Sequence, residues 1–310
     1  MTTASSSPPA RRSRFARIRN LRWYSWVFLV VVLGYALAFL MHWDDRAMLW
    51  LQEGFQTKAE RKASIWLPDY HVAIDAKVLP GMKEYEASDL SYNPATKTLF
   101  AVMGKKPFLV ELSLTGDVLR EIPLSGWSNP EGVAVLNDGL IAITDERQHL
   151  LTISRVTADT TELEIADAQK YDLGTSDNQN KGFEGVAWDP ARQQLLLGEE
   201  RPAEIFTWKS DGGRILTGNK RSVSSNELDV RNLSSLSIDP RTGHTLVLSA
   251  DSHLLLELDE EGRQVSFMTL LGGMNGLADT IPRAEGVALD EEGTLYIVSE
   301  PNLFYSYRKH

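Results

Sequence analysis

The stretch Glu184-Gly-Val-Ala-Trp-Asp-Pro190 decides the fold, because variants of it occur four more times along the chain. The other copies are Ser88-Asp-Leu-Ser-Tyr-Asn-Pro94, Glu131-Gly-Val-Ala-Val-Leu-Asn137, Ser234-Ser-Leu-Ser-Ile-Asp-Pro240 and Glu285-Gly-Val-Ala-Leu-Asp-Glu291. Their first residues lie 43 to 53 positions apart, a period typical of the four-stranded blades of a β-propeller. Each copy reads as a short strand that ends in a turn, and a second apolar strand follows it. The sequence therefore predicts an all-β fold, a β-propeller with five blades.

The two ends of the repeat array indicate how the ring closes. The last unit, Glu285 to His310, is long enough for only about three strands. Tyr70 to Val78 alternates apolar and polar residues, as a strand does, and can supply the fourth strand of that blade. Such pairing would remove the open sheet edges of the ring. A six-bladed ring is the alternative, with a degenerate unit in residues 157–181.

The N-terminal region has the pattern of a membrane anchor. Residues 1–22 contain six Arg and no acidic residue, and Trp23 to Trp43 then runs without a charged side chain. That run matches the roughly 20 apolar residues that span a bilayer, and the arginines before it predict a cytoplasmic N-terminus. We expect a basic cytoplasmic tail over 1–22 and a transmembrane helix over 23–43. A cleaved signal peptide is the alternative, because Ala36-Leu37-Ala38 resembles a cleavage site.

The remaining boundaries follow from the anchor. Residues 44–66 are charged, with apolar positions spaced as in a short amphipathic helix, and we interpret them as a stalk or linker. Residues 67–310 then form the propeller domain. These expectations place the protein in the inner (plasma) membrane with a single pass, and place the propeller on the periplasmic side.

Composition excludes several classes of function. The formal net charge is −10, and only 26 of the 32 basic residues but all 42 acidic residues follow residue 22, so a nucleic-acid partner for the acidic body is not expected. The chain has no Cys, which excludes disulfides, thiolate metal sites and a Cys nucleophile. The six His are scattered, and the common hydrolase, nucleotide-binding and zinc-protease motifs do not occur.

Several motifs resemble the bacterial SdiA-regulated (YjiK-like) family. They are Leu67-Pro-Asp-Tyr-His-Val-Ala-Ile-Asp-Ala-Lys77, Leu90-Ser-Tyr-Asn-Pro-Ala-Thr-Lys-Thr-Leu-Phe100, Glu131-Gly-Val133, Thr144-Asp-Glu-Arg147 and Glu184-Gly-Val-Ala-Trp-Asp189. The resemblance covers roughly residues 66–308. It implies a β-propeller on the far side of the inner membrane, often behind one N-terminal span, and it implies no defined activity.

Acidic residues occur in register from repeat to repeat. The leading residues Glu131, Glu184 and Glu285 begin the innermost strand of their blades, so we expect them to face the central channel near one mouth. Antiparallel pairing brings the end of the second strand close to the start of the first. The residues expected around the three glutamates are Asp145, Glu146, Glu199, Glu200 and Glu300.

Clustered oxygen ligands, with neither Cys nor clustered His, favour a hard divalent cation, and Ca²⁺ is the predicted ion. Local ion pairs with Arg147 and Arg201 are the alternative that needs no metal. The resulting hypothesis is a ligand-binding or scaffold module of the cell envelope, with an unknown small ligand or envelope protein as its partner. A calcium-dependent hydrolase resembling lactonase or phosphotriesterase propellers is the second hypothesis, although Ser88 and Ser234 take the place of two leading glutamates.

Overall fold

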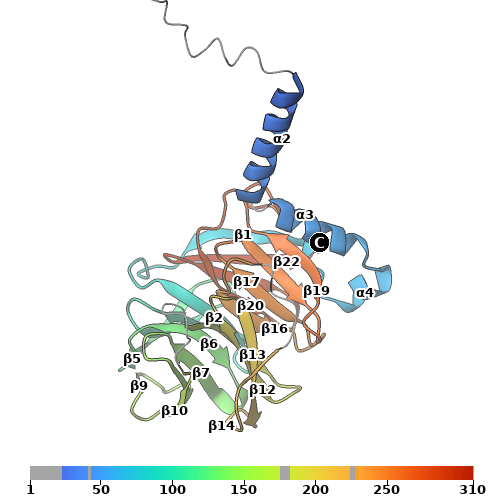
Figure 1. Ribbon diagram of the computed structural model, residues 1–310. Coiled ribbons are helices and arrows are strands. Elements are labelled where there is room, and N and C mark those ends of the chain that lie inside the picture. The colour runs from blue at the N-terminus through green and yellow to red at the C-terminus, as the bar shows by residue number, and fades with distance from the viewer. Residues whose placement is uncertain (1–22, 41–42, 175–181, 224–227, 229, 310) are drawn as a thin grey trace, which may run out of the picture. The chain divides into compact units, whose positions relative to one another are not determined.

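The computed structural model describes residues 23–40, 43–174, 182–223, 228 and 230–309. The chain divides into two compact units at Leu49, and the second unit is a five-bladed β-propeller (Figure 1). The predicted fold and blade number are thereby confirmed. The predicted basic tail, residues 1–22, lies outside the described residues.

Each blade is an antiparallel sheet whose first strand lines the channel. Blade 1 contains β2 (Ala87–Asn93), β3 (Thr98–Met103), β4 (Phe108–Leu112) and β5 (Val118–Ser125), and blade 2 contains β6 (Pro130–Val135), β7 (Leu140–Asp145), β8 (Leu150–Arg155) and β10 (Gln169–Asp172). Blade 3 contains β11 (Phe183–Asp189), β12 (Gln194–Glu199) and β13 (Glu204–Asp211), with the short strands β14 (Ile215–Leu216) and β15 (Arg221–Ser222). Blade 4 contains β16 (Ser235–Ile238), β17 (Thr245–Ser249), β18 (Leu254–Leu258) and β19 (Gln264–Thr269).

Blade 5 is closed by the first strand of the domain. It contains β20 (Ala284–Leu289), β21 (Leu295–Ser299), β22 (Leu303–Lys309) and β1 (Tyr70–Val78). β1 pairs antiparallel with β22, from Tyr70 opposite Lys309 to Val78 opposite Leu303 (Figure 1). The predicted closure is therefore present.

The described residues of the interval 157–181 form no separate blade, so the six-bladed alternative is wrong. Instead, β9 (Leu163–Glu164) pairs in parallel with β5 of blade 1, whereas β10 completes blade 2. The interval thus supplies outer strands to two neighbouring blades. Its length comes from that crossing between blades.

The hydrophobic core lies between the blades. Five clusters of buried residues fill the interfaces of blades 4 and 5, 5 and 1, 2 and 3, 1 and 2, and 3 and 4. In the 4/5 interface, for example, Leu248 packs with Val287 and with Tyr307, all of which are excluded from solvent. Strands inside a blade, such as β7 and β17, are buried on both faces, whereas the outer strands β1 and β5 alternate between buried or partly buried residues and exposed ones.

Helices precede the propeller. They are α2 (Trp23–Leu40), α3 (Trp43–Gly54), α4 (Lys58–Ala63) and the 3₁₀ turn η1 (Leu67–Asp69), and a second 3₁₀ turn, η2 (Asn137–Gly139), lies inside blade 2. The α4 helix begins with a capping box, in which the Thr57 hydroxyl accepts from the Glu60 N–H and the Glu60 carboxylate accepts from the Thr57 N–H. Among the described residues, no helix combines the length and the hydropathy needed to cross a membrane.

Candidate functional site: the acidic end of the channel

The leading residues of the repeats occupy irregular positions in their strands. The β2/β3, β6/β7, β11/β12 and β20/β21 ladders each shift register at one place, and the residues at the shift are Ser88, Glu131, Glu184 and Glu285. A bulge leaves a residue without a partner across the ladder and redirects its side chain. The same irregularity, repeated around the ring, explains why these side chains collect at one end of the channel.

The glycine after each leading glutamate allows the innermost strands to approach closely. A Cβ atom on Gly132 would lie 2.1 Å from the carbonyl oxygen of Glu184 in the next blade. A Cβ atom on Gly286 would lie 2.6 Å from the backbone nitrogen of Leu90. The Glu-Gly pair therefore combines an acid directed at the channel with a residue small enough for blade-to-blade contact.

Blades 1 and 4 use the same two positions differently. Ser88-Asp89 and Ser234-Ser235 replace the Glu-Gly pair, and their second residues reach across the channel. The Asp89 carboxylate accepts from the Val133 N–H at 2.8 Å and from the Ser235 hydroxyl at 2.5 Å, and it is completely buried. Burial raises the pKa of Asp89 well above its usual range. These bonds link the innermost strands β2, β6 and β16 of three blades.

The opposite end is apolar. The ends of all five innermost strands enclose a cavity of about 130 Å³, whose lining includes Leu90, Tyr92, Trp188, Leu236 and Leu289. The two ends of one channel therefore differ in chemistry. One end presents the leading glutamates, and the other presents mainly hydrocarbon and aromatic rings, with Ser91, Ser237 and Glu291 also in its lining.

The three predicted glutamates interact with one another. Burial is the main cause that raises the pKa of Glu131 to about 8, and the carboxylates of Glu146, Glu285 and Glu300 raise it further. The pKa of Glu184 is also raised well above its usual range, by burial and then by Glu200, Glu131 and Glu285. Like charges in a partly dehydrated site oppose one another's ionisation.

Glu285 differs because a base lies beside it. Its pKa is raised to about 7 by burial, while the neighbouring Arg283 opposes that change. The Arg283 guanidinium lies 3.2 Å from a carboxylate oxygen of Glu285 and 2.9 Å from one of Glu300. One side of the acidic end is therefore neutralised in part by the protein itself.

The five surrounding acids divide into two groups. Glu146, Glu200 and Glu300 act on the leading glutamates, as the pKa shifts show. Asp145 instead accepts hydrogen bonds from the Ser128, Asn129 and Gln148 N–H groups, at 2.6 to 3.2 Å, and so fixes a loop. Glu199 has a pKa raised by burial and then by Glu204, with Lys220 opposing, and these neighbours belong to blade 3.

Arg147 and Arg201 are the two bases that were predicted to pair with these acids if no metal binds. Arg201 lies 3.6 Å from Glu200 and also pairs with Asp251 of blade 4. Arg147 is exposed and forms no ion pair with another residue in the described part of the chain. Of the ion pairs predicted as the alternative to a metal, the structure contains the one between Arg201 and Glu200.

Two polar residues of the site were not predicted. Asn129 donates one amide hydrogen to Glu131 at 2.6 Å and another to Glu146 at 3.0 Å, and Arg283 contacts Glu285. Both lie two residues before a leading glutamate, and Asn232 lies two residues before Ser234 and donates to its hydroxyl at 3.0 Å. The same offset holds Glu86 and Gly182 in the other two blades, so no common residue type marks this position in the repeats.

The ligand atoms at the acidic end are of the kind that a hard cation prefers, but the side chains are not arranged as a metal site. Carboxylate, amide and hydroxyl oxygens are the ligands that Ca²⁺ prefers. In the described part of the chain, however, no three His, Asp or Glu side chains already converge as a metal site. Coordination of Ca²⁺ here would require the glutamate side chains to move toward one another.

Similarity to solved structures is limited to general resemblance. A chain of the crystal structure of the nidogen/laminin complex aligns at 17% identity over 74% of this chain and 85% of its own length, with a TM-score of 0.48. A chain of Kuenenia stuttgartiensis hydrazine synthase aligns at 12% identity, over 73% of this chain and 57% of its own length (TM-score 0.41). A protein of unknown function from Bacteroides caccae aligns at 17% identity, over 70% and 72% of the two chains (TM-score 0.43).

A family model gives the firmer relationship. The model described as SdiA-regulated matches residues 62–308, which include all five blades and the strand that closes the ring. The predicted resemblance is confirmed. This chain belongs to the SdiA-regulated family.

Proposed function

We propose that this protein is a membrane-anchored binding module of the cell envelope and that the acidic end of its channel binds a cation. One observation carries the proposal: Glu131, Glu184 and Glu285 stand at the same register shift in three blades, and burial and neighbouring carboxylates raise the pKa of each. Burying several acids together is unfavourable unless something compensates their charge. A cation from solution would provide that compensation.

Ca²⁺ is the ion that we propose. The direct ligands would come from the three leading glutamates, and Glu146, Glu200 and Glu300 would add negative charge around them. Because carboxyl groups with raised pKa values carry protons near neutral pH, binding of Ca²⁺ would release protons. Apparent affinity should accordingly increase as the pH rises from about 6 to about 8.

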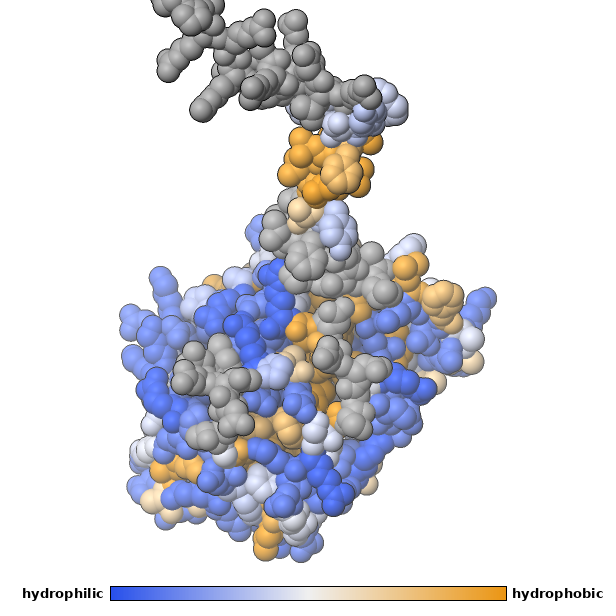
Figure 2. Space-filling model, viewed as in Figure 1, coloured by the Kyte–Doolittle hydropathy of each residue, from blue (hydrophilic) through white to orange (hydrophobic). Residues whose placement is uncertain are grey.

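Membrane anchoring is supported by the N-terminal sequence. The run from Trp23 to Trp43 has no charged residue, six arginines precede it, and the apolar side chains of α2 from Val27 to Leu33 are exposed. Figure 2 shows the hydrophobic surface of α2, in contrast to the mostly hydrophilic face of the propeller. Under this proposal the N-terminus is cytoplasmic, the propeller is periplasmic, and the partner is a small ligand or an envelope protein.

Calcium titration of the full chain in detergent tests the cation site. We expect isothermal titration calorimetry to show one Ca²⁺ bound, with a heat that depends on the buffer because protons are released. Replacing Glu184 with Gln should abolish this binding and the accompanying rise in melting temperature. The matched control is Glu164→Gln, since Glu164 is exposed on the outer strand β9.

Three outcomes would change the proposal. Absence of heat and of thermal stabilisation in the unchanged protein would show that the acids are compensated internally. Equal binding by the Glu184 and Glu164 variants would place the ion elsewhere. Calcium-dependent turnover of a lactone or a phosphotriester would favour the hydrolase, for which the Glu-Gly pairs at the channel are the supporting feature.

A further inference from the structure

The segment between the predicted span and β1 is attached to blade 4. Leu49 on α3 is 2% exposed and packs in the same cluster as Leu254 and Leu256. Glu53, one helical turn later, accepts a hydrogen bond from the Phe267 N–H of β19 at 2.7 Å. One face of the last turns of α3 therefore lies on the outer strand of the blade.

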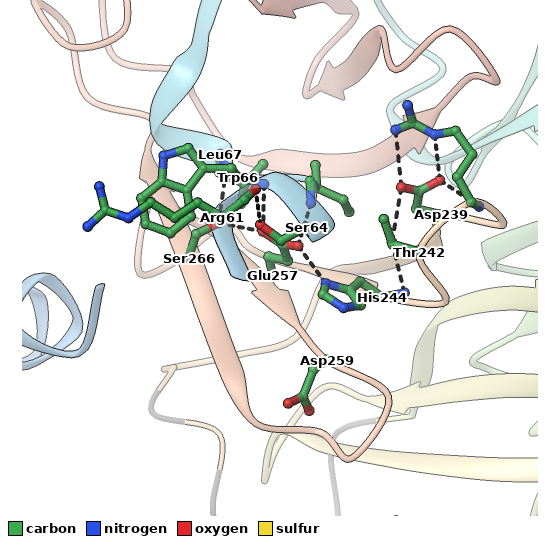
Figure 3. A network of polar contacts seen from close by, with 12 residues as sticks. Arg61, Ser64, Trp66, Leu67, Asp239, Thr242, His244, Glu257, Asp259 and Ser266 are labelled. Carbon is green, nitrogen blue, oxygen red and sulfur yellow. Dashed lines mark hydrogen bonds and ion pairs between the residues drawn. The ribbon is translucent and has the colours of Figure 1, made fainter. Parts of the chain in front are cut away.

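The end of the segment is fixed more firmly. The buried Glu257 carboxylate accepts from the N–H groups of Ile65 and Trp66, at 2.7 and 2.9 Å, and from the Ser266 hydroxyl at 2.6 Å. The His244 ring lies 2.6 Å from the same carboxylate. Figure 3 shows these groups around Glu257, with Arg61 beside the Trp66 ring. Residues 49–67 are thus part of the propeller unit and not a free spacer.

The opposite face of the same segment is apolar and exposed. Trp50 and Leu51 on α3 are 68% and 52% exposed, and Phe55, in the turn directly after α3, is 85% exposed. Other large apolar residues exposed on the described propeller, such as Leu119 and Ile215, occur singly. Figure 2 shows hydrophobic surface over this region of α3.

Chain length limits where this face can be. If residues 23–43 span the bilayer, six peptide units connect Trp43 to Leu49, and a chain of that length reaches at most about 20 Å. Leu49 is itself part of the propeller unit. The exposed face begins at the next residue, so it must lie close to the membrane surface.

We infer that Trp50, Leu51 and Phe55 insert into the interfacial layer of the bilayer, as a second membrane contact of the propeller. This inference rests on the proposed membrane anchor. Exposed aromatic and aliphatic side chains on a short helix and on the turn that follows it suit a segment that lies in the interface. Exposed Lys58 and Lys62 follow on α4 and suit the anionic headgroups of phospholipids. Blade 4 would then face the membrane.

Single-cysteine labelling tests the inference, because the natural chain has no Cys. The full chain with Phe55→Cys is labelled with the fluorophore NBD and placed in nanodiscs of phosphatidylcholine and phosphatidylglycerol. We expect a blue-shifted emission, protection from aqueous iodide, and quenching by doxyl-labelled lipid. The control is Ile215→Cys, which is 51% exposed on blade 3 and should respond to iodide alone.

Any other pattern of quenching would reject the inference and would show what surrounds position 55. Iodide quenching at position 55 as strong as at position 215 would show a face in water. Protection from iodide without quenching by doxyl lipid would show a protein cover. Flotation of the chain with liposomes on a density gradient separates the two proposals: a chain that does not float lacks the membrane anchor, whereas one that floats with position 55 in water lacks only the second contact. Leu51→Cys provides an independent repeat at the same face.

Discussion

Ionisation of the leading glutamates, of which Glu285 is buried and Glu131 partly buried, has an energetic cost that depends on pH. An acid whose pKa is raised in the folded protein keeps its proton there at pH values where the unfolded chain has already lost it. Glu131, with its pKa raised to about 8, and Glu285, with its pKa raised to about 7, are in this position relative to a usual value of 4.5. The folded state therefore binds more protons than the unfolded state across that interval.

We predict that, without divalent cations, the free energy of unfolding falls as the pH rises from about 4.5 to about 8. One pKa unit corresponds to about 1.4 kcal/mol, so the loss should reach a few kcal/mol. Urea denaturation at pH 5 and pH 8 measures it. Glu131→Gln should flatten the dependence, and Glu164→Gln should not. His244, whose pKa is raised mainly by Glu257, contributes stability that is also lost with rising pH, but it is common to both variants.

Gly132 lies where two innermost strands approach each other closely. Its replacement by Ala puts a methyl group 2.1 Å from the Glu184 carbonyl oxygen and 2.6 Å from the Thr144 hydroxyl, so the innermost strands must separate. We expect a loss of about 1–3 kcal/mol in the free energy of unfolding, together with weaker cation binding. Gly54→Ala is the control, since its Cβ atom would meet nothing within 4 Å. Equal stability of the two variants would contradict the close approach of the strands.

The sequence predicted part of this site and missed part for a physical reason. Repeat register alone placed Glu131, Glu184 and Glu285 together, because identical positions in blades share one end of the ring. It did not reveal the role of Asp89, whose partners Val133 and Ser235 lie 44 and 146 positions away. Only the curvature of the ring brings those residues into contact.

The pairing of two strands, β1 and β22, closes the ring. β1 pairs with β22, and its Tyr70 side chain is buried in the core between blades 4 and 5. The Tyr70 hydroxyl also donates to the Gly293 carbonyl at 2.9 Å. Without β1, the outer edge of β22 and this part of the core would be exposed to water.

We therefore expect deletion of residues 66–80 to lower the melting temperature far more than deletion of residues 44–62. The first deletion removes a strand and the Leu67 and Tyr70 side chains from the core. The second removes mainly the contacts of Leu49 and Glu53 with blade 4. Thermal unfolding followed by circular dichroism compares the two. Similar melting temperatures would mean that β1 does not secure the ring.

The same elements show a limit of sequence patterns. Strict alternation identified Tyr70–Val78 as a strand, and the short last repeat identified its partner. The attachment of residues 49–67 was not foreseen, because Glu257 binds the Ile65 N–H across 192 positions and neither residue belongs to a periodic pattern. A charged segment with a few apolar residues looks like a linker when its partner surface is unknown.

For the whole molecule, five repeats give five blades, and five hydrophobic clusters join them. The count was predictable because each blade needs one copy of the same strand and turn. The difference between the two ends of the channel was predictable only in part. Asp89 and Ser235, which take the glycine position in blades 1 and 4, form a hydrogen bond between these blades that the repeat pattern did not predict.

Because the first strand closes the ring, it must wait for the last strand to be synthesised before it can pair. Asn302 donates to the Leu79 carbonyl at 2.8 Å, so the two sides of the closing blade are 223 positions apart in the chain. At ribosomal rates of roughly 5–20 residues per second, β1 would be made about 10–50 s before its partner strand. Until the C-terminal strand is made, β1 has no partner and remains an unpaired, partly apolar strand. Under the proposed periplasmic location, a chaperone that shields extended segments would be needed most in that interval, and a chain truncated before β22 would never bury the strand.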